Sequence, residues 1–155
     1  MNSSEWGDAL LGALVGLANA VRGNEDPAGK TAAALCRQGL AMAMRGDADD
    51  NALRAMTERV RAEKWRIVPD CAVCAFPCGR NNDYDMSLLW TDDERIQSLK
   101  IRLLRAAAGS AACPQEILFE ALRSVGDIWE IEILEETVQK IERCCEAQEK
   151  EQLQV

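Results

Sequence analysis

The spacing of its apolar residues most constrains how this chain can fold. Leu, Ile, Val, Met and Ala recur every three or four positions in successive segments that are separated by Gly, Pro and Asp. That period places apolar side chains on one face of an α-helix, whereas a half-buried strand would require strict alternation. Apolar residues make up 48% of the chain but aromatic residues only 5%, and this composition favours packed helices over sheets. The sequence therefore predicts an all-α fold with essentially no strand.

The first part of the chain, residues 1–68, predicts three helices. The first ends near Gly23, and the second begins at Pro27, which follows an aspartate cap, and stops at Gly46. The third must end before Pro69, because the residue preceding a proline avoids α geometry. Its cap is one of three aspartates, Asp47, Asp49 or Asp50. Its expected apolar stripe consists of Leu53, Met56, Val60 and Trp65.

The last part of the chain, residues 91–150, predicts three more helices. Thr91 and Glu94 have the spacing of a capping box at the start of the fourth helix. Pro114 opens the fifth, and Gly126-Asp127 is expected to form the turn into the sixth. The charged tail beyond Glu146 is expected to fray.

The two parts share one layout. Each has a long apolar helix, a loop that ends in proline, a shorter helix, an acidic turn and an amphipathic third helix. A shift of 81 positions aligns Leu53 with Leu134 and Val60 with Ile141. We therefore predict a single helical domain built from two antiparallel three-helix bundles, related as a pseudo-repeat and joined by a connector.

The connector, residues 69–90, carries the most distinctive chemistry of the chain. Cys71, Cys74 and Cys78 fall within eight residues, in a segment whose Pro, Gly, Asn and Asp content predicts irregular backbone. The Cys-x2-Cys spacing lets neighbouring thiolates converge on one ion or cluster. These three cysteines are therefore the candidate ligands of a zinc ion or an iron–sulfur cluster.

A complete site would need one more ligand. Tetrahedral zinc and four-iron clusters usually take four protein ligands, and no fourth follows the connector at motif spacing. The remaining thiols are Cys36, Cys113, Cys144 and Cys145. Cys36 and Cys145 lie on apolar helical stripes, where a cysteine usually acts as a small hydrophobe. The competing interpretation is that all the cysteines are structural thiols, either reduced or prone to form disulfides.

Basic residues surround the connector. They are Arg59, Arg61, Lys64 and Arg66 on the preceding helix, and Arg80 after the cysteines. Positive charge near the thiols would lower their pKa and offset the charge of a cluster. The ordinary role of such residues at a helix C-terminus is to complement the helix dipole.

Charge and composition disfavour several functional classes. The net charge of −8 opposes binding to nucleic acid or to an anionic membrane. The chain contains no histidine, which excludes Ser–His and Cys–His nucleophile pairs and histidine-ligated metal sites. The segment Gly23–Thr31 resembles a phosphate-binding loop, but five residues instead of four separate its glycines, and Pro27 removes an amide.

The apolar run Ala9–Ala20 also has two other interpretations, and neither fits. It is too short to span a bilayer. The residues before it include Glu5 and Asp8 and no basic residue, whereas a secretory signal begins with positive charge. An odd number of cysteines without a convincing export signal predicts a reducing, cytoplasmic location.

Several segments together resemble a known family. They are Leu10–Ala20, Arg59–Lys64, Pro69–Arg80, Asp83–Met86 and Ile96–Lys100. The chain resembles small helical proteins related to the hybrid-cluster (prismane) proteins, which are commonly labelled hydroxylamine reductases. The likeness covers most of the chain. It is to the N-terminal helical domain of that family, which is built from two three-helix bundles, and it implies an anaerobic redox setting.

The departures from the family matter as much as the likeness. Hybrid-cluster proteins carry a four-cysteine iron–sulfur motif at the N-terminus, whereas Met1–Asp8 contains no cysteine. They hold the hybrid cluster in two later α/β domains through His, Glu and Cys ligands, for which this chain has neither the length nor a histidine.

We therefore expect an accessory module that binds a metal or an iron–sulfur cluster, as a homodimer or beside a redox enzyme. The alternative is a cofactor-free helical interaction or dimerisation domain with structural thiols. An autonomous reductase would need an acid–base pair or a complete cluster site, and the sequence presents neither.

Overall fold

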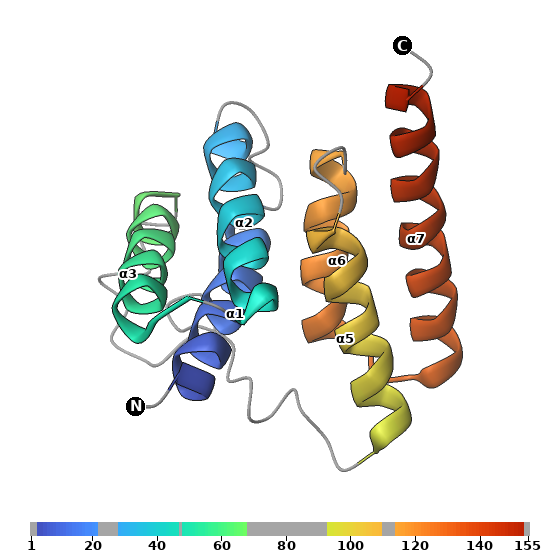
Figure 1. Ribbon diagram of the computed structural model, residues 1–155, viewed down its shortest axis with the longest axis horizontal. Coiled ribbons are helices and arrows are strands. Elements are labelled where there is room, and N and C mark those ends of the chain that lie inside the picture. Colours follow the sequence, from blue (N-terminus) through green and yellow to red (C-terminus); the bar gives the residue numbers. More distant parts are fainter. Residues whose placement is uncertain (1–2, 22–27, 47, 68–92, 110–113, 154–155) are drawn as a thin grey trace.

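The computed structural model describes residues 3–21, 28–46, 48–67, 93–109 and 114–153. Every regular element within these ranges is an α-helix, so the predicted all-α class is confirmed for this part of the chain (Figure 1). The helices are α1 (Ser3–Ala20), α2 (Ala28–Arg45), α3 (Asp50–Ile67), α5 (Glu94–Ala108), α6 (Gln115–Asp127) and α7 (Ile131–Leu153).

The boundaries of the first three helices follow local chemistry. Gly46 ends α2 as predicted, with a φ of 74° that L side chains rarely adopt and glycine adopts freely. Among the three candidate caps of α3, Asp49 fills the role: its Oδ1 accepts a hydrogen bond from the Ala52 N–H at 2.8 Å.

The expected start of α5 is wrong. The helix begins at Glu94 and is capped by Asp93, whose Oδ1 accepts from the backbone N–H groups of Arg95 and Ile96, at 3.0 and 3.4 Å. Aspartate caps at least as well as threonine, and its short carboxylate reaches the first free amides of the helix. The capping box that begins at Thr91 is therefore not the start of this helix.

Two further boundaries differ from the sequence predictions. Gly126-Asp127 does not form the turn, because α6 continues through Asp127 and the Ile128 N–H donates to the Ser124 carbonyl at 3.0 Å. The turn lies at residues 128–130 instead. The backbone of α7 stays helical to Leu153, where fraying was expected. Its final turns consist largely of Glu, Gln and Lys, which favour helix.

The helices pack into one continuous core. Helices α1, α2 and α3 contact one another, and so do α5, α6 and α7. The contacts of α1 with α6, and of α2 with α5 and α6, join the two groups, which lie side by side in Figure 1. The most deeply buried large apolar residues come from both groups: Leu10, Leu14, Leu17, Leu40, Leu103, Leu104, Leu118, Phe119, Leu122, Leu134 and Ile141.

Two contacts show how tightly the first three helices approach. A Cβ added at Gly39 of α2 would lie 2.9 Å from Cδ2 of Leu14, so this glycine allows α2 to pack closely on α1. On α3, Trp65 was expected in the core but is 39% exposed. Lys64, four residues after Val60, takes the inward position, where its Nζ lies beside Gly16 of α1.

Candidate functional site

The predicted ligands Cys71, Cys74 and Cys78 lie outside the described residues, as do Arg80 and Cys113. Within the described ranges, no three Cys, Asp or Glu side chains gather in an arrangement that would hold a metal ion. The same ranges contain no helix that is long and apolar enough to cross a membrane.

The described cysteines occupy different environments, and none of the three forms a disulfide. Cys36 on α2 is fully buried in the core, and this burial raises the pKa of its thiol to about 12, although nearby Arg37 and Arg123 favour the thiolate. Cys145 on α7 is also buried, whereas Cys144 is half-buried. Cys36 and Cys145 therefore pack as small hydrophobes, as their helical stripes predicted.

Arg66 and Lys64, two cations predicted near the connector, have contacts within the first three helices. Arg66 forms an ion pair with Glu63, and its Nε donates to both carboxylate oxygens at 3.1 Å. That hydrogen bonding raises the pKa of Arg66 above its usual value. Lys64 is buried against α1. Arg59 remains exposed, with Nη1 4.0 Å from the sulfur of Met56.

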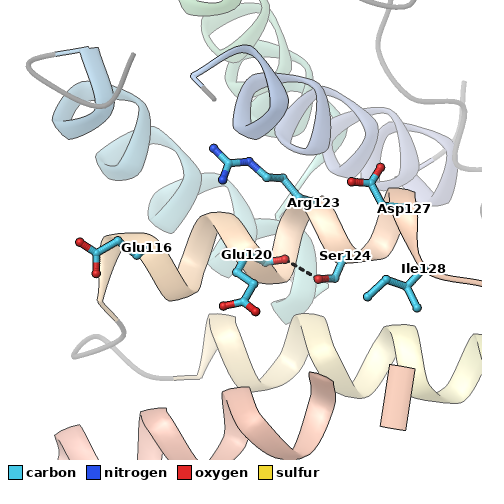
Figure 2. Close-up of a pocket in the computed structure, with 6 residues that line it drawn as sticks. All are labelled: Glu116, Glu120, Arg123, Ser124, Asp127 and Ile128. Carbon is cyan, nitrogen blue, oxygen red and sulfur yellow. Dashed lines mark hydrogen bonds between the residues drawn. The ribbon is translucent and has the colours of Figure 1, made fainter. Parts of the chain in front are cut away.

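One surface cavity of about 400 Å³ lies along α6 (Figure 2). Its lining residues are Glu116, Glu120, Arg123, Ser124, Asp127 and Ile128. In Figure 2, Arg123 points from α6 toward α1 and α2, and its Nε donates to the Ala18 carbonyl at 3.0 Å. The Glu120 carboxylate points to the other side of α6, and accepts from Lys140 of α7 at 2.8 Å. These two side chains therefore tie α6 to neighbouring helices on both of its sides.

A second cavity of about 290 Å³ lies where the start of α1, the end of α2 and the start of α3 meet. Half of its lining residues are glycine or alanine: Gly7, Asp8, Leu11, Met42, Ala43, Gly46, Ala48 and Leu53. Near this end, the Arg54 guanidinium lies 6.0 Å from the centre of the Trp6 ring, a distance at the limit of a cation–π contact.

Sequence reasoning missed a buried cation in the second group of helices. Lys100 on α5 is fully buried, and its Nζ lies 3.3 Å from the centre of the Trp129 ring. Its Nζ has no hydrogen-bond partner among the described residues, and burial lowers the pKa of this amine to about 8. The sequence did indicate this burial, because Lys100 lies four residues after Ile96 and three before Leu103, on the apolar stripe of α5.

The second group also exposes apolar side chains. Trp129 is 42% exposed and Ile133 is 45% exposed, and they lie four residues apart at the start of α7. Exposed carboxylates stand beside them at Glu130, Glu132 and Glu136. This combination of an apolar centre with a charged rim is typical of a surface that contacts another molecule.

Comparison with protein-family models, with curated proteins and with solved structures finds no match to this chain. The resemblance to hybrid-cluster proteins therefore stays a prediction from the sequence.

Proposed function

We propose that this chain is a cytoplasmic accessory module that binds zinc or an iron–sulfur cluster through Cys71, Cys74 and Cys78. In this proposal it is related to the hydroxylamine reductase family and works as a homodimer or beside a redox enzyme, without being a complete reductase. The observation that carries the proposal is the spacing of three thiols within eight residues.

The described residues narrow the choice of a fourth ligand. Metal binding requires a thiolate, and the pKa of about 12 keeps Cys36 protonated at neutral pH inside the core. Cys145 is buried on the inward stripe of α7. Cys144 is half-buried on the same helix, so Cys144 and Cys113 are the better candidates, unless a second copy supplies the ligand.

The test is metal analysis and absorbance of protein purified without air. We expect bound iron or zinc in the wild type, and loss of that metal in Cys71→Ser and Cys74→Ser. Cys36→Ala is the matched control, because it removes a thiol from the core and should leave the metal content unchanged. Metal-free wild-type protein, with serine variants of unchanged stability, would contradict the proposal.

We infer a second candidate function, a cofactor-free helical interaction domain whose thiols are structural. The exposed Trp129 and Ile133 with their acidic rim support it. It predicts that a chain with all three connector cysteines replaced by serine unfolds at the same temperature as the wild type. A large drop in that temperature would contradict this candidate and favour the metal-binding one.

We also propose the architecture expected from the sequence, a pseudo-repeat of two antiparallel three-helix bundles joined by the cysteine connector. The mutual contacts within α1–α3 and within α5–α7 support it. So does the corresponding burial of Leu53 and Val60 on α3 and of Leu134 and Ile141 on α7.

A further inference from the structure

An acidic surface with an apolar centre lies at the start of α7. It consists of Trp129, Glu130, Glu132, Ile133 and Glu136, all exposed, and is called the α7 patch below. One face of the Trp129 ring covers the buried Lys100. The rest of the ring and nearly half of Ile133 stay exposed to water. Covering these two side chains would remove apolar area from water, which is favourable at about 25 cal/mol per Å².

A basic surface with an apolar centre lies on α3. Its exposed positions lie on one face of the helix and are called the α3 stripe below: Ala55, Glu58, Arg59, Ala62, Trp65 and Arg66. Glu58 is paired with Arg54 of the same helix, and Arg66 is paired with Glu63. Among the described helices, α3 makes its main contacts with α1 and α2, on the side away from this stripe. The two alanines leave room for another helix to approach closely between the arginines and the tryptophan.

The two helices that carry these surfaces have opposite net charges. Helix α3 carries five basic and three acidic residues, whereas α7 carries three basic and seven acidic residues. Each surface also contains an exposed tryptophan, at Trp65 and Trp129, and aromatic residues with arginine are enriched where proteins meet. The three large hydrophobic side chains exposed within the described residues, Trp65, Trp129 and Ile133, all lie on these two surfaces.

We propose that the α7 patch of one copy binds the α3 stripe of a second copy. The proposal rests on the interaction-domain candidate above and names the partner and the surfaces. In Figure 1, α3 and α7 lie at opposite edges of the molecule, so one contact leaves an unused stripe on one copy and an unused patch on the other. The contact is therefore heterologous, and it builds chains or a closed ring with increasing concentration.

Sedimentation velocity over about 1 µM to about 1 mM protein tests for this association. We expect the average mass to rise with concentration in low salt. Raising the salt from about 0.05 M to about 0.5 M should weaken the association at least about tenfold, because the surfaces are drawn together by opposite charge. A wild-type chain that stays monomeric over the whole range would overturn the proposal, even if the α7 patch then proved to bind a different protein.

Two variants test which surfaces meet. Ile133→Glu disables the patch and Trp65→Glu disables the stripe, and each alone should weaken self-association at least about tenfold. Ala34→Glu on α2 and Ser98→Glu on α5 add the same charge at exposed positions outside both surfaces, and should associate like the wild type. Far-ultraviolet circular dichroism checks that each variant is folded.

Mixing the two disabled variants gives the decisive result. Ile133→Glu retains an intact stripe and Trp65→Glu retains an intact patch, so an equal mixture should form a 1:1 heterodimer that grows no further. Self-association of Trp65→Glu alone at wild-type strength would indicate pairing between two patches and would overturn the proposal. The same series on a chain with Cys71, Cys74 and Cys78 all replaced by serine tests the interaction-domain candidate separately from the proposed contact. If this chain is unfolded, the interaction-domain candidate is contradicted. If it is folded and monomeric, only the proposed contact is contradicted.

Discussion

Helices α1 and α7 bury their apolar residues in opposite ways. All nine residues from Leu10 to Ala18 are buried, so α1 is covered around its whole circumference by α2, α3 and α6. Helix α7 is longer, but from Ile131 to Glu146 it buries a single stripe, formed by Leu134, Val138, Ile141 and Cys145. The rest of its surface from Ile131 to Glu146 is half-buried or exposed.

This difference separates two uses of a helix. A helix surrounded on all sides has no surface left for a partner. Every change in the volume of its side chains disturbs the close packing of the core. A helix at the edge keeps its outer face available, and substitutions there change stability little. We therefore expect substitutions in and around α1 to act on folding, and substitutions on the outer face of α7 to act on association.

The largest effect should come from the centre of α1. Leu14→Ala should lower the free energy of unfolding by about 3–4 kcal/mol, because Leu14 is fully buried and the space it leaves cannot close completely. Ile133→Ala on α7 removes a side chain that is 45% exposed and should change stability by less than about 0.5 kcal/mol. Urea denaturation of both variants measures the contrast, and equal losses would break the distinction between the two helices.

The next effect tests how closely α2 packs on α1. Gly39→Ala places a Cβ 2.9 Å from Cδ2 of Leu14, and the resulting overpacking should outweigh the gain in helix propensity, for a net loss of about 1–2 kcal/mol. Gly7→Ala is the matched control, because no atom lies within 4 Å of its added Cβ. That variant should gain about 0.5–1 kcal/mol. If Gly39→Ala and Gly7→Ala shift the denaturation midpoint in the same direction, the contact with Leu14 is not tight.

The third effect concerns Lys100, covered by the tryptophan just before α7. Its folded pKa of about 8 lies below the ordinary value of 10.5, so the unfolded chain binds more protons than the folded chain between these pH values. Stability should therefore rise as the pH increases from about 8 to about 10.5. The full shift corresponds to roughly 3 kcal/mol, and water beside the exposed edge of Trp129 should reduce the observed rise to about 1–2 kcal/mol.

The control for this prediction is Lys100→Met, which keeps the packing and removes the titrating amine. Cys36 acts in the opposite direction, because its folded pKa of about 12 exceeds the ordinary 9.0 and stability falls as the pH rises through that interval. The difference between wild type and Lys100→Met cancels the Cys36 contribution. A difference that does not change between pH 8 and pH 10.5 would show that Lys100 is hydrated in the folded protein.

The contrast between α1 and α7 also explains what the sequence could predict. Periodic positions such as Leu14 and Leu134 predicted the helices and most of the core, because burial of an apolar stripe depends on spacing alone. The helix ends were predicted less accurately where several neighbouring residues can cap or end the helix. Asp93 caps α5 in place of Thr91. Gly126 stays inside α6 because it does not adopt the positive φ with which Gly46 ends α2.

Features that depend on tertiary contacts were not predictable in this way. Lys64 faces the core in place of Trp65, because the inward position lies four residues after Val60. Gly16 on α1 leaves space for the lysine side chain. Lys100 is buried under Trp129, which is 29 positions away in the sequence. No pattern of neighbouring residues in the sequence predicts such a contact. The candidate ligands Cys71, Cys74 and Cys78 lie outside the described residues and stay a prediction.

The smallest effect should come from the ion pair that joins α5 to the outer side of α7. Arg102 donates to both carboxylate oxygens of Glu142, with Nε–Oε2 at 2.9 Å and Nη2–Oε1 at 2.6 Å. Both side chains are partly exposed, at 53% and 30%, so water and salt screen their attraction. A double-mutant cycle with Arg102→Ala and Glu142→Ala should show a coupling that shifts the unfolding midpoint by about 2 °C or less and disappears in high salt. A coupling that persists at about 1 M salt would mean that this edge of α7 is as shielded from water as α1.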